Sequence, residues 1–384
     1  MRTFHRRHFL QLGSLSAGLA LPHVVLAAAP AAGAEDRRVR LSGDGLGLTP
    51  LEYAALVHRL IDEHGITPDS YSLGGIVEQL EEECARVLGK ERAIFMPTGT
   101  LANHMAVRAL AGGASRVLVQ EESHLYQDEG DCAQTLSSLT LMPLGAGRAT
   151  FSADEVQRVL DDTKAARVVS RVSAISIETP VRRKQGERFD PAELQKIIAI
   201  ARRDGIRLHL DGARLFLESA YSGESVAEYC KPFDTVYVSL YKYFNAASGA
   251  ILAGRREIID GMYHGRRMFG GGLNHVWPFA LVAHHYFNGF GERYGRAVKV
   301  SEEWIAKLRQ NDRFTIERIP LGTNLFRLQV RGVDAAAFRQ RLEAGGVFLG
   351  PAQDGRFLVG VNETLNRTTA TALSDAFAQA LAAK

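Results

Sequence analysis

The chain has 384 residues, of which 46% are hydrophobic and 23% are charged, and its formal net charge is +3. This length allows two domains around a large shared core. No basic stripe with interleaved aromatic residues is present, which argues against nucleic acid as a partner. Three scattered cysteines give neither a disulfide framework nor a zinc-binding spacing, and we predict no bound metal.

Residues 1–34 have the order of a secretory signal. Arg6 and Arg7 precede an apolar stretch, which is followed by the small residues of "LAAAPAAGA". Glycine, serine and proline interrupt the apolar stretch, so it makes a poor membrane anchor. We therefore predict a Tat-type signal peptide, cleaved between Ala28 and Ala34 after passage through the Tat export machinery. The mature protein is expected to be periplasmic or secreted, with no stable membrane anchor.

Strand-like and helix-like segments alternate along the next part of the chain. The cap at Asp190, followed by Pro191, marks the start of one of the helices. Strands are predicted at 93–99 (running into a turn), 116–120, 172–179, 207–213, 235–240 and 248–254, and helices at 100–112, 152–163 and 190–205. Such alternation predicts an α/β fold with a mostly parallel sheet covered by helices on both faces.

From about Gly289 the pattern changes. A long helix at 292–310 is followed by shorter strands at 323–330 and 355–361, with a helix between them and another at the end. We predict a large domain over residues 35–288, with an N-terminal arm, and a smaller C-terminal α+β domain over 289–384.

Several polar residues stand at the predicted carboxyl ends of strands, where ligands bind in such sheets. Gly99 and Thr100 lie at a strand-to-helix turn, which suits either a phosphate or a plain helix cap. Asp211 ends another strand, where it meets either Arg214 or a ring nitrogen of a ligand. His124 follows a third strand, and a lone histidine there is by itself uninformative.

Lys242 lies between two apolar strands, in "VSLYKYFNAASGAILAG". A lysine is seldom fully buried without a partner, so it either reaches water or its amine is bonded. A phosphate turn, then an acid at a strand end, then a lysine is the order that suits pyridoxal 5'-phosphate. That cofactor requires a lysine for a Schiff base, an acid at its pyridine nitrogen and a cradle for its phosphate.

At these segments the chain resembles the threonine aldolase group, part of the β-eliminating-lyase-related family of fold-type-I pyridoxal phosphate enzymes. The segments that carry the resemblance are "AIFMPTGTLAN", "HLYQDEGDCAQ", "LHLDGARLF", "SLYKYFNAASGAILAG" and "RRMFGGGLN". It runs from about Leu41 to the C-terminus. The fold that it implies is of the aspartate-aminotransferase type.

The resemblance implies a role for each matching residue toward the cofactor. Lys242 would hold the cofactor and move protons, and Asp211 would pair with the pyridine nitrogen. His124 would stack on the ring, and these three residues would form the catalytic set. Gly99 and Thr100 would hold the phosphate.

The resemblance also implies residues that bind the substrate, and an assembly. Arg214, beside the cofactor, and Arg356 would bind the carboxylate of a small amino acid substrate. Members of the family form homodimers or homotetramers with active sites at subunit interfaces. Arg266 or Arg267 would then reach the phosphate of a neighbouring subunit.

Three segments depart from the pattern of the family. Tyr241 and Tyr243 flank the lysine where the family has serine and glycine. The family has a histidine-containing segment where this chain reads "TPVRRKQGERFD", with Arg182 and Arg183 either pairing with a second acidic group of the substrate or forming a solvated basic loop. "SGDGLGLT" replaces the N-terminal Ser-Asp-Thr motif.

Because these segments lie where the family binds its substrate, the sequence leaves three functions open. The first is an aldolase-type lyase that cleaves the Cα–Cβ bond of a β-hydroxy amino acid to glycine and an aldehyde. The second is another activity on the same scaffold, β-elimination or racemisation. The third is an inactive exported binding protein.

Overall fold

The computed structural model describes residues 37–382. The predicted signal peptide and its cleavage site lie outside the described residues, so both stay predictions. Within the described range, no helix combines the length and the hydrophobicity needed to cross a membrane.

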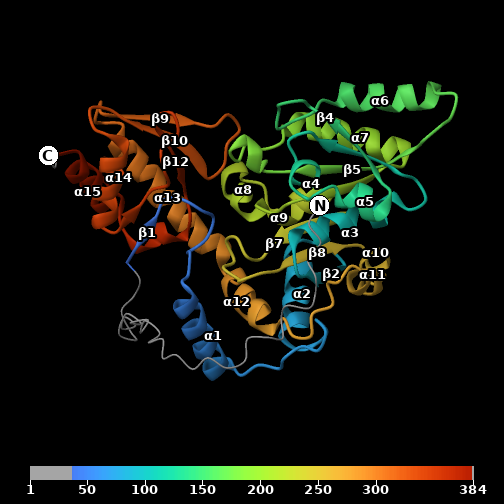
Figure 1. The fold of residues 1–384 in the computed structure, drawn as a ribbon, viewed down its shortest axis with the longest axis horizontal. Helices are drawn as coiled ribbons and strands as arrows, with labels where there is room; N and C mark the ends of the chain where they lie inside the picture. The colour runs from blue at the N-terminus through green and yellow to red at the C-terminus, as the bar shows by residue number, and fades with distance from the viewer. Residues whose placement is uncertain (1–36, 383–384) are drawn as a thin grey trace, which may run out of the picture. The chain divides into compact units, whose positions relative to one another are not determined.

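A seven-stranded sheet, in the order β2-β8-β7-β6-β5-β3-β4, forms the centre of the larger part (Figure 1). Its neighbouring strands run parallel, except that β8 is antiparallel to both β2 and β7. The strands are β2 (Arg92–Met96), β3 (Arg116–Gln120), β4 (Thr140–Leu144), β5 (Val172–Glu178), β6 (Arg207–Asp211), β7 (Thr235–Ser239) and β8 (Ala250–Gly254). The predicted α/β fold with a mostly parallel sheet is confirmed.

Apolar residues cover both faces of this sheet, because successive side chains of a strand point to opposite faces. In β3, Val117 and Val119 pack in one hydrophobic cluster and Leu118 packs in the other. The helices of this part are α1 (Pro50–His64), α2 (Gly75–Val87), α3 (Gly99–Ala111), α4 (His124–Gln127), α5 (Cys132–Ser137), α6 (Ala153–Ala165), α7 (Pro191–Asp204), α8 (Leu215–Ser222), α9 (Val226–Cys230), α10 (Arg256–Ile259), α11 (Met262–Met268) and α12 (Trp277–Phe287), with a 3-10 turn at Arg182–Lys184.

Side-chain caps fix the beginnings of the helices that carry the site. The hydroxyl of Thr98 accepts a hydrogen bond from the backbone of the first turn of α3, and Ser123 does the same for α4. Asp190 caps α7 ahead of Pro191, as the sequence predicts. These caps set where α3 and α4 begin, directly after strands β2 and β3.

The C-terminal part has a separate antiparallel sheet in the order β12-β10-β9 (Figure 1). Its elements are α13 (Phe290–Leu308), β9 (Phe314–Arg318), β10 (Leu325–Val330), α14 (Ala335–Ala344), β11 (Val347–Phe348), β12 (Arg356–Gly360), a 3-10 turn at Glu363–Arg367 and α15 (Ala370–Ala382). Strand β1 (Val39–Arg40) pairs with β11. The start of the N-terminal arm therefore packs on C-terminal elements, and the domain boundary at residue 289 stays a prediction.

Candidate active site

A cavity of about 940 Å³ opens at the carboxyl ends of the parallel strands. Four residues singled out from the sequence line it, namely His124, Asp211, Arg214 and Lys242. They stand at or just after the ends of three strands: His124 follows β3, Asp211 and Arg214 belong to the end of β6 and the segment after it, and Lys242 follows β7. The carboxyl ends of parallel strands meet at one edge of a sheet. This shared edge explains why residues far apart in the sequence converge here.

Asp211 ends β6 and is 3% exposed. Its Oδ2 accepts a hydrogen bond from Asn103 Nδ2 at 2.8 Å, and its Oδ1 accepts one from the backbone N–H of Ala213 at 3.1 Å. The same Asn103 amide donates to Glu129 Oε1 at 2.8 Å, and its Oδ1 lies 3.0 Å from His209 Nε2. Asn103 therefore joins two buried carboxyl groups and a buried imidazole.

Burial also determines the charge of His209, which is fully buried below Asp211. Desolvation lowers the pKa of His209 to about 4, even though Asp211 acts in the opposite direction. The imidazole is therefore neutral near pH 7, and its Nδ1 lies 2.9 Å from the hydroxyl of Thr235. A neutral His209 leaves the negative charge of Asp211 available to a ligand in the cavity.

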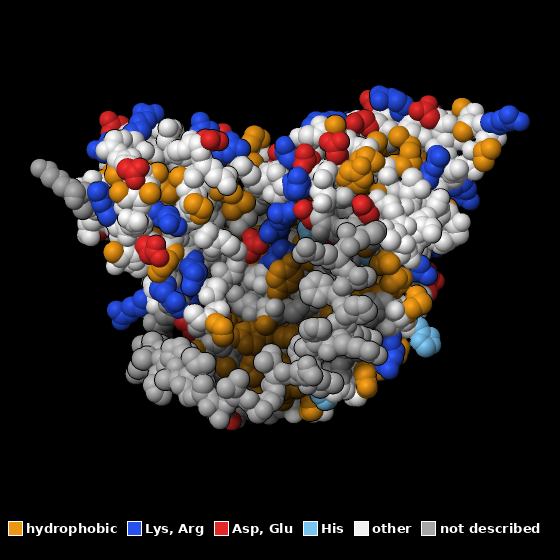
Figure 2. Space-filling view, viewed as in Figure 1, with side chains coloured by type: hydrophobic (Ala, Val, Ile, Leu, Met, Phe, Trp, Pro, Cys, Tyr) orange, Lys and Arg blue, Asp and Glu red, His pale blue; other side chains and the backbone are white. Residues whose placement is uncertain are grey.

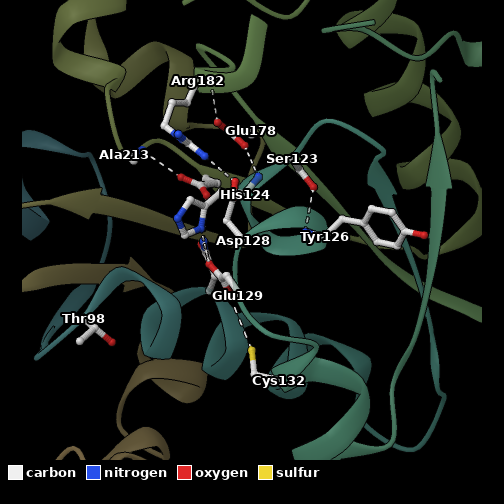
Figure 3. Close-up of polar contacts among 12 residues, drawn as sticks. Thr98, Ser123, His124, Tyr126, Asp128, Glu129, Cys132, Glu178, Arg182 and Ala213 are labelled. Carbon is white, nitrogen blue, oxygen red and sulfur yellow. Dashed lines mark hydrogen bonds and ion pairs between the residues drawn. The ribbon is translucent and has the colours of Figure 1, made fainter. Parts of the chain in front are cut away.

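His124 begins α4, and its ring contacts Glu129 (Figure 3). Glu129 is in turn linked to Asp211 through the amide of Asn103. Its Nδ1 lies 2.9 Å from Glu129 Oε1, and this hydrogen bond is the largest cause that raises the pKa of His124. The Glu129 side chain is 0% exposed. Glu129 thus both orients the ring and favours its protonated form.

Glu178 ends β5 and also lines the cavity (Figure 3). Its carboxylate accepts backbone hydrogen bonds from His124 at 2.6 Å and from Arg182 at 2.9 Å. Burial is the largest cause that raises the pKa of Glu178 to about 7, and the neighbouring Asp211 acts in the same direction. Glu178 therefore ties the loop after β3 to the loop after β5.

Asn103, Glu129 and Glu178 were missed by the sequence interpretation. Glu129 stands five positions after His124 in "HLYQDEG", which is a possible signal for a paired acid. Asn103 lies inside α3 and gives no such signal, because its role comes from the contact of α3 with β6.

Lys242 lies in the loop after β7, rather than in a strand, and it is half-buried. Its Nζ is 3.1 Å from the hydroxyl of Tyr241 and 4.5 Å from the centre of that ring. The loop carries the lysine to the wall of the cavity. The amine is thus exposed to a ligand.

Gly99 and Thr100 do not line the cavity, but Gly99 packs closely on Tyr237, which does. Gly99 begins α3, and a Cβ atom there would lie 2.1 Å from the hydroxyl of Tyr237, so no other residue fits without a shift. Thr100 follows it, partly buried. Ser239, at the end of β7, has a buried hydroxyl with no hydrogen-bond partner among the described residues.

These features pass a test of fit for pyridoxal phosphate. The amine of Lys242 and the carboxylate of Asp211 both line the cavity, and the hydroxyl of Ser239 is buried at the end of β7. The helix beginning at Gly99 adds backbone N–H groups suited to an anion. The residues present therefore fit an aldehyde, a ring nitrogen and a phosphate.

The two arginines assigned to the substrate carboxylate lie in different places. Arg214 lines the cavity, and its guanidinium is bound to Asp44. Arg356 does not line this cavity but lies on β12, where it is exposed and pairs with Glu317 at 3.2 Å. The role of Arg356 toward the substrate therefore stays a prediction, and its position here does not support it.

The four remaining arginines that the sequence singled out also lie in different places. Arg182 lines the cavity and pairs with Asp128 at 2.6 Å, whereas Arg183 lies outside it. Arg266 is fully buried and donates to the backbone oxygens of Phe95 and Tyr71. Arg267 is exposed, and the contact of either arginine with a neighbouring subunit stays a prediction.

Comparison with known proteins agrees with this geometry. The model of the beta-eliminating lyase family matches residues 66–333. A structure from Exiguobacterium sp. 255-15, described as a candidate aromatic amino acid beta-eliminating lyase or threonine aldolase, is 26% identical with a TM-score of 0.71. It covers 90% of this chain and 98% of that one.

Two curated relatives carry different activities in their names. The low-specificity L-threonine aldolase of Candida albicans is 30% identical over 54% of this chain and 55% of that protein. The alanine racemase TOXG of Cochliobolus carbonum is 28% identical over 59% of this chain and 61% of that protein. The chain thus spans little more than half the length of either relative. With the family match over most of the chain and a site that fits the cofactor, this protein belongs to the beta-eliminating lyase family, whose cofactor is pyridoxal 5'-phosphate.

Proposed function

We propose that this protein is a pyridoxal-phosphate-dependent lyase of the threonine-aldolase type, which cleaves a β-hydroxy amino acid to glycine and an aldehyde. The observation that carries the proposal is the convergence of His124, Asp211, Arg214 and Lys242 on one cavity. Membership of the beta-eliminating lyase family and the likeness to a threonine aldolase give the reaction class.

Each of these residues has a role that its surroundings support. When bound, the cofactor supplies an electron-withdrawing ring that weakens the bonds at the substrate α-carbon. Asp211, held by Asn103, would keep a ring nitrogen of the cofactor protonated, and the amine of Lys242 would hold the cofactor and move protons. His124, whose Nδ1 is hydrogen-bonded to Glu129, would stack on the ring, and Arg214 would bind the carboxylate of the substrate.

The attachment residue is tested by chemical labelling. Borohydride treatment of the loaded protein should fix the mass of the cofactor on the peptide that contains Lys242. Lys242→Ala should lose the visible absorbance of the bound cofactor. Lys184, whose amine donates to the backbone of Gly147, provides the control, and Lys184→Ala should keep the absorbance of the bound cofactor. A label on another lysine would contradict the assignment.

The reaction itself is tested by product analysis. The purified protein should be given a panel of β-hydroxy amino acids, β-substituted amino acids and single enantiomers of alanine. Glycine and an aldehyde are expected from the first group. Pyruvate or a related keto acid from the second group would instead indicate β-elimination.

Racemisation is the second candidate, because one relative is named as an alanine racemase. It requires proton transfer on both faces of the α-carbon rather than cleavage of the Cα–Cβ bond. Appearance of the opposite enantiomer of alanine, without glycine from any β-hydroxy amino acid, would replace the first proposal with this one.

The twin arginine at Arg6 and Arg7 supports a further proposal, export of the folded protein through the Tat machinery to the periplasm or the medium. Replacing both arginines by lysine should retain the protein in the cytoplasm. Finding the unaltered protein there with its N-terminus intact would contradict the proposal.

We also propose a homodimer or homotetramer, in which the exposed Arg267 reaches the phosphate site of a neighbouring subunit. Light scattering gives the mass of the assembly. Arg267→Ala should weaken cofactor binding without changing that mass. A monomer in solution would contradict the proposal.

A further inference from the structure

The segment from Ser42 to Gly47 forms one wall of the cavity. Its position is fixed on two sides. The backbone N–H of Leu46 donates to Asn245 Oδ1 at 2.7 Å, and the backbone oxygen of Gly43 accepts from Asn362 Nδ2 at 3.1 Å. The wall is thus attached both to the loop that carries Lys242 and to the C-terminal part.

Gly45 shows how closely this wall approaches the lysine loop. A Cβ atom at Gly45 would lie 2.4 Å from the backbone oxygen of Lys242 and 2.5 Å from Asn245 Oδ1. A side chain here would force the two segments apart. The backbone on either side of Asp44 is therefore held in place, and the direction of the Asp44 side chain is set by packing.

Asp44 points from this wall to Arg214. Both Nε and Nη2 of the arginine lie 2.9 Å from the same oxygen, Oδ2 of Asp44. The two side chains are only 17% and 15% exposed, so the pair is largely removed from solvent. Because ion pairs are screened less as they become buried, this contact fixes the guanidinium more firmly than a surface pair would.

The contact occupies one edge of the guanidinium. Arginine presents a planar fork with donors on more than one edge, and Asp44 takes the edge formed by Nε and Nη2. Among the described residues, no other acceptor is hydrogen-bonded to Arg214. The Nη1 donors and one Nη2 donor are therefore left for a ligand in the cavity.

We propose that Asp44 is a positioning residue that orients Arg214 to receive the carboxylate of the substrate. The inference rests on the proposed function, in which Arg214 binds that carboxylate. An arginine held on one edge presents the other edge without first losing rotational freedom, so binding costs less conformational entropy. The segment "SGDGLGLT", which differs from the family motif, would thus help to bind the substrate by orienting Arg214.

The opposite arrangement makes a different prediction. If Asp44 only occupied the place of the substrate carboxylate, its removal would free Arg214 and strengthen binding. The sign of the change in affinity therefore separates positioning from competition.

The test compares two small ligands that differ in the carboxylate. Glycine and glycinamide are titrated into the cofactor-loaded protein, and the change in cofactor absorbance gives each Kd. Asp44→Asn should raise the Kd for glycine about tenfold or more, the cost of a weakened charge-assisted hydrogen bond. The Kd for glycinamide should change less than about twofold, because glycinamide has no anion for Arg214.

Matched variants separate this role from a general structural one. Glu302→Gln removes the carboxylate partner of Arg318 outside the cavity and should change neither Kd. Asp44→Ser removes the charge with a smaller side chain and should repeat the selective loss. Cofactor affinity should be that of the unaltered protein in every variant except those of Arg214.

A double-mutant cycle checks that Asp44 acts through Arg214. In the Arg214→Gln background, Asp44→Asn should have no further effect on glycine binding. The proposal is overturned if Asp44→Asn strengthens glycine binding, leaves it unchanged, or weakens glycine and glycinamide equally. If the unaltered protein neither binds glycine nor cleaves a β-hydroxy amino acid, the proposed function fails first and takes this inference with it.

Discussion

Two polar clusters near His124 both contain acidic side chains, but they differ in how deeply they are buried. The inner network consists of Asn103, Glu129, His209 and Asp211. The rim cluster consists of Glu122, Asp128, Arg182 and Arg183. The inner network is buried, whereas the rim cluster belongs to the surface, where acidic and basic side chains lie side by side across the visible face (Figure 2).

Burial decides what each cluster contributes. The side chain of Glu129 is 0% exposed, while those of Arg182 and Asp128 are 45% and 26% exposed. A buried polar group left without a partner costs about 1–3 kcal/mol, whereas an exposed ion pair contributes about 0–1 kcal/mol. The inner network is therefore expected to control chemistry and stability, and the rim cluster to affect at most the choice of substrate.

The largest effect is expected from removing the inner charge. Asp211→Asn keeps the shape of the side chain but removes the negative charge from the floor of the cavity. We expect kcat for cleavage of a β-hydroxy amino acid to fall about a hundred- to a thousandfold, the usual cost of losing one preorganised electrostatic group. Steady-state kinetics would measure this fall in kcat. Asp128→Asn in the rim cluster is the control, and an equal fall in kcat for that variant would contradict the distinction between the clusters.

The second prediction concerns stability. Asn103→Ala leaves Glu129, His209 and Asp211 each without one hydrogen-bond partner in a buried place. We expect the free energy of unfolding to fall by about 2–3 kcal/mol, measured from the midpoint of urea denaturation. Gln127→Ala, an exposed amide that donates to the backbone of Glu121, is the comparison. A similar loss for both variants would contradict the argument from burial.

The third prediction concerns pH dependence. The hydrogen bond from Glu129 raises the pKa of His124, with Asp211 and Glu178 acting in the same direction and burial opposing them. Glu129→Gln should therefore lower the pKa of His124. If the neutral imidazole is the active form, the acid limb of the profile of kcat/KM against pH moves to lower pH.

The effect on rate should be smaller than that of Asp211→Asn. The rate at the optimum should fall about tenfold, because one charge-assisted hydrogen bond is weakened. Glu122→Gln in the rim cluster should leave the profile in place. A shift to higher pH, or none, would mean that Glu129 does not set the protonation of His124.

The smallest effects are expected at the rim. Arg182→Ala and Arg183→Ala should each change the free energy of unfolding by less than about 0.5 kcal/mol. Arg182 alone lines the cavity, so Arg182→Ala should raise KM about tenfold for a β-hydroxy amino acid with an acidic side chain and leave a neutral one unaffected. Equal rates on both substrates would make Arg182 only a surface charge.

The strands and helices of the large sheet followed from local patterns in the sequence. The strand at 116–120 has the predicted bounds, and the helix after Asp190 begins at its cap. The antiparallel direction of β8 was not predicted, because its apolar run reads the same in either direction. Strands β4 and β9 were also missed, although β9 alternates between apolar and polar residues and Gly145 directly follows β4.

The site was predicted in part. The sequence places Asp211 and His124 at the ends of strands, and Lys242 between two of them, because a strand end is a local feature. It did not show that Arg356 lies outside the lining of the cavity, since the place of β12 depends on its pairing with β10. Nor could it show the partner of Arg214, which stands 170 residues away.

What the sequence determined by itself is the order of strands, helices and polar turns, because periodicity and capping act over a few residues. The tertiary structure alone decided which of those polar groups meet. Asn103 bridges Asp211 and Glu129 only because α3 packs across the sheet next to β6. Asp44 reaches Arg214 only because the N-terminal arm forms one wall of the cavity. Such long-range contacts depend on tertiary packing, which a local sequence pattern does not show.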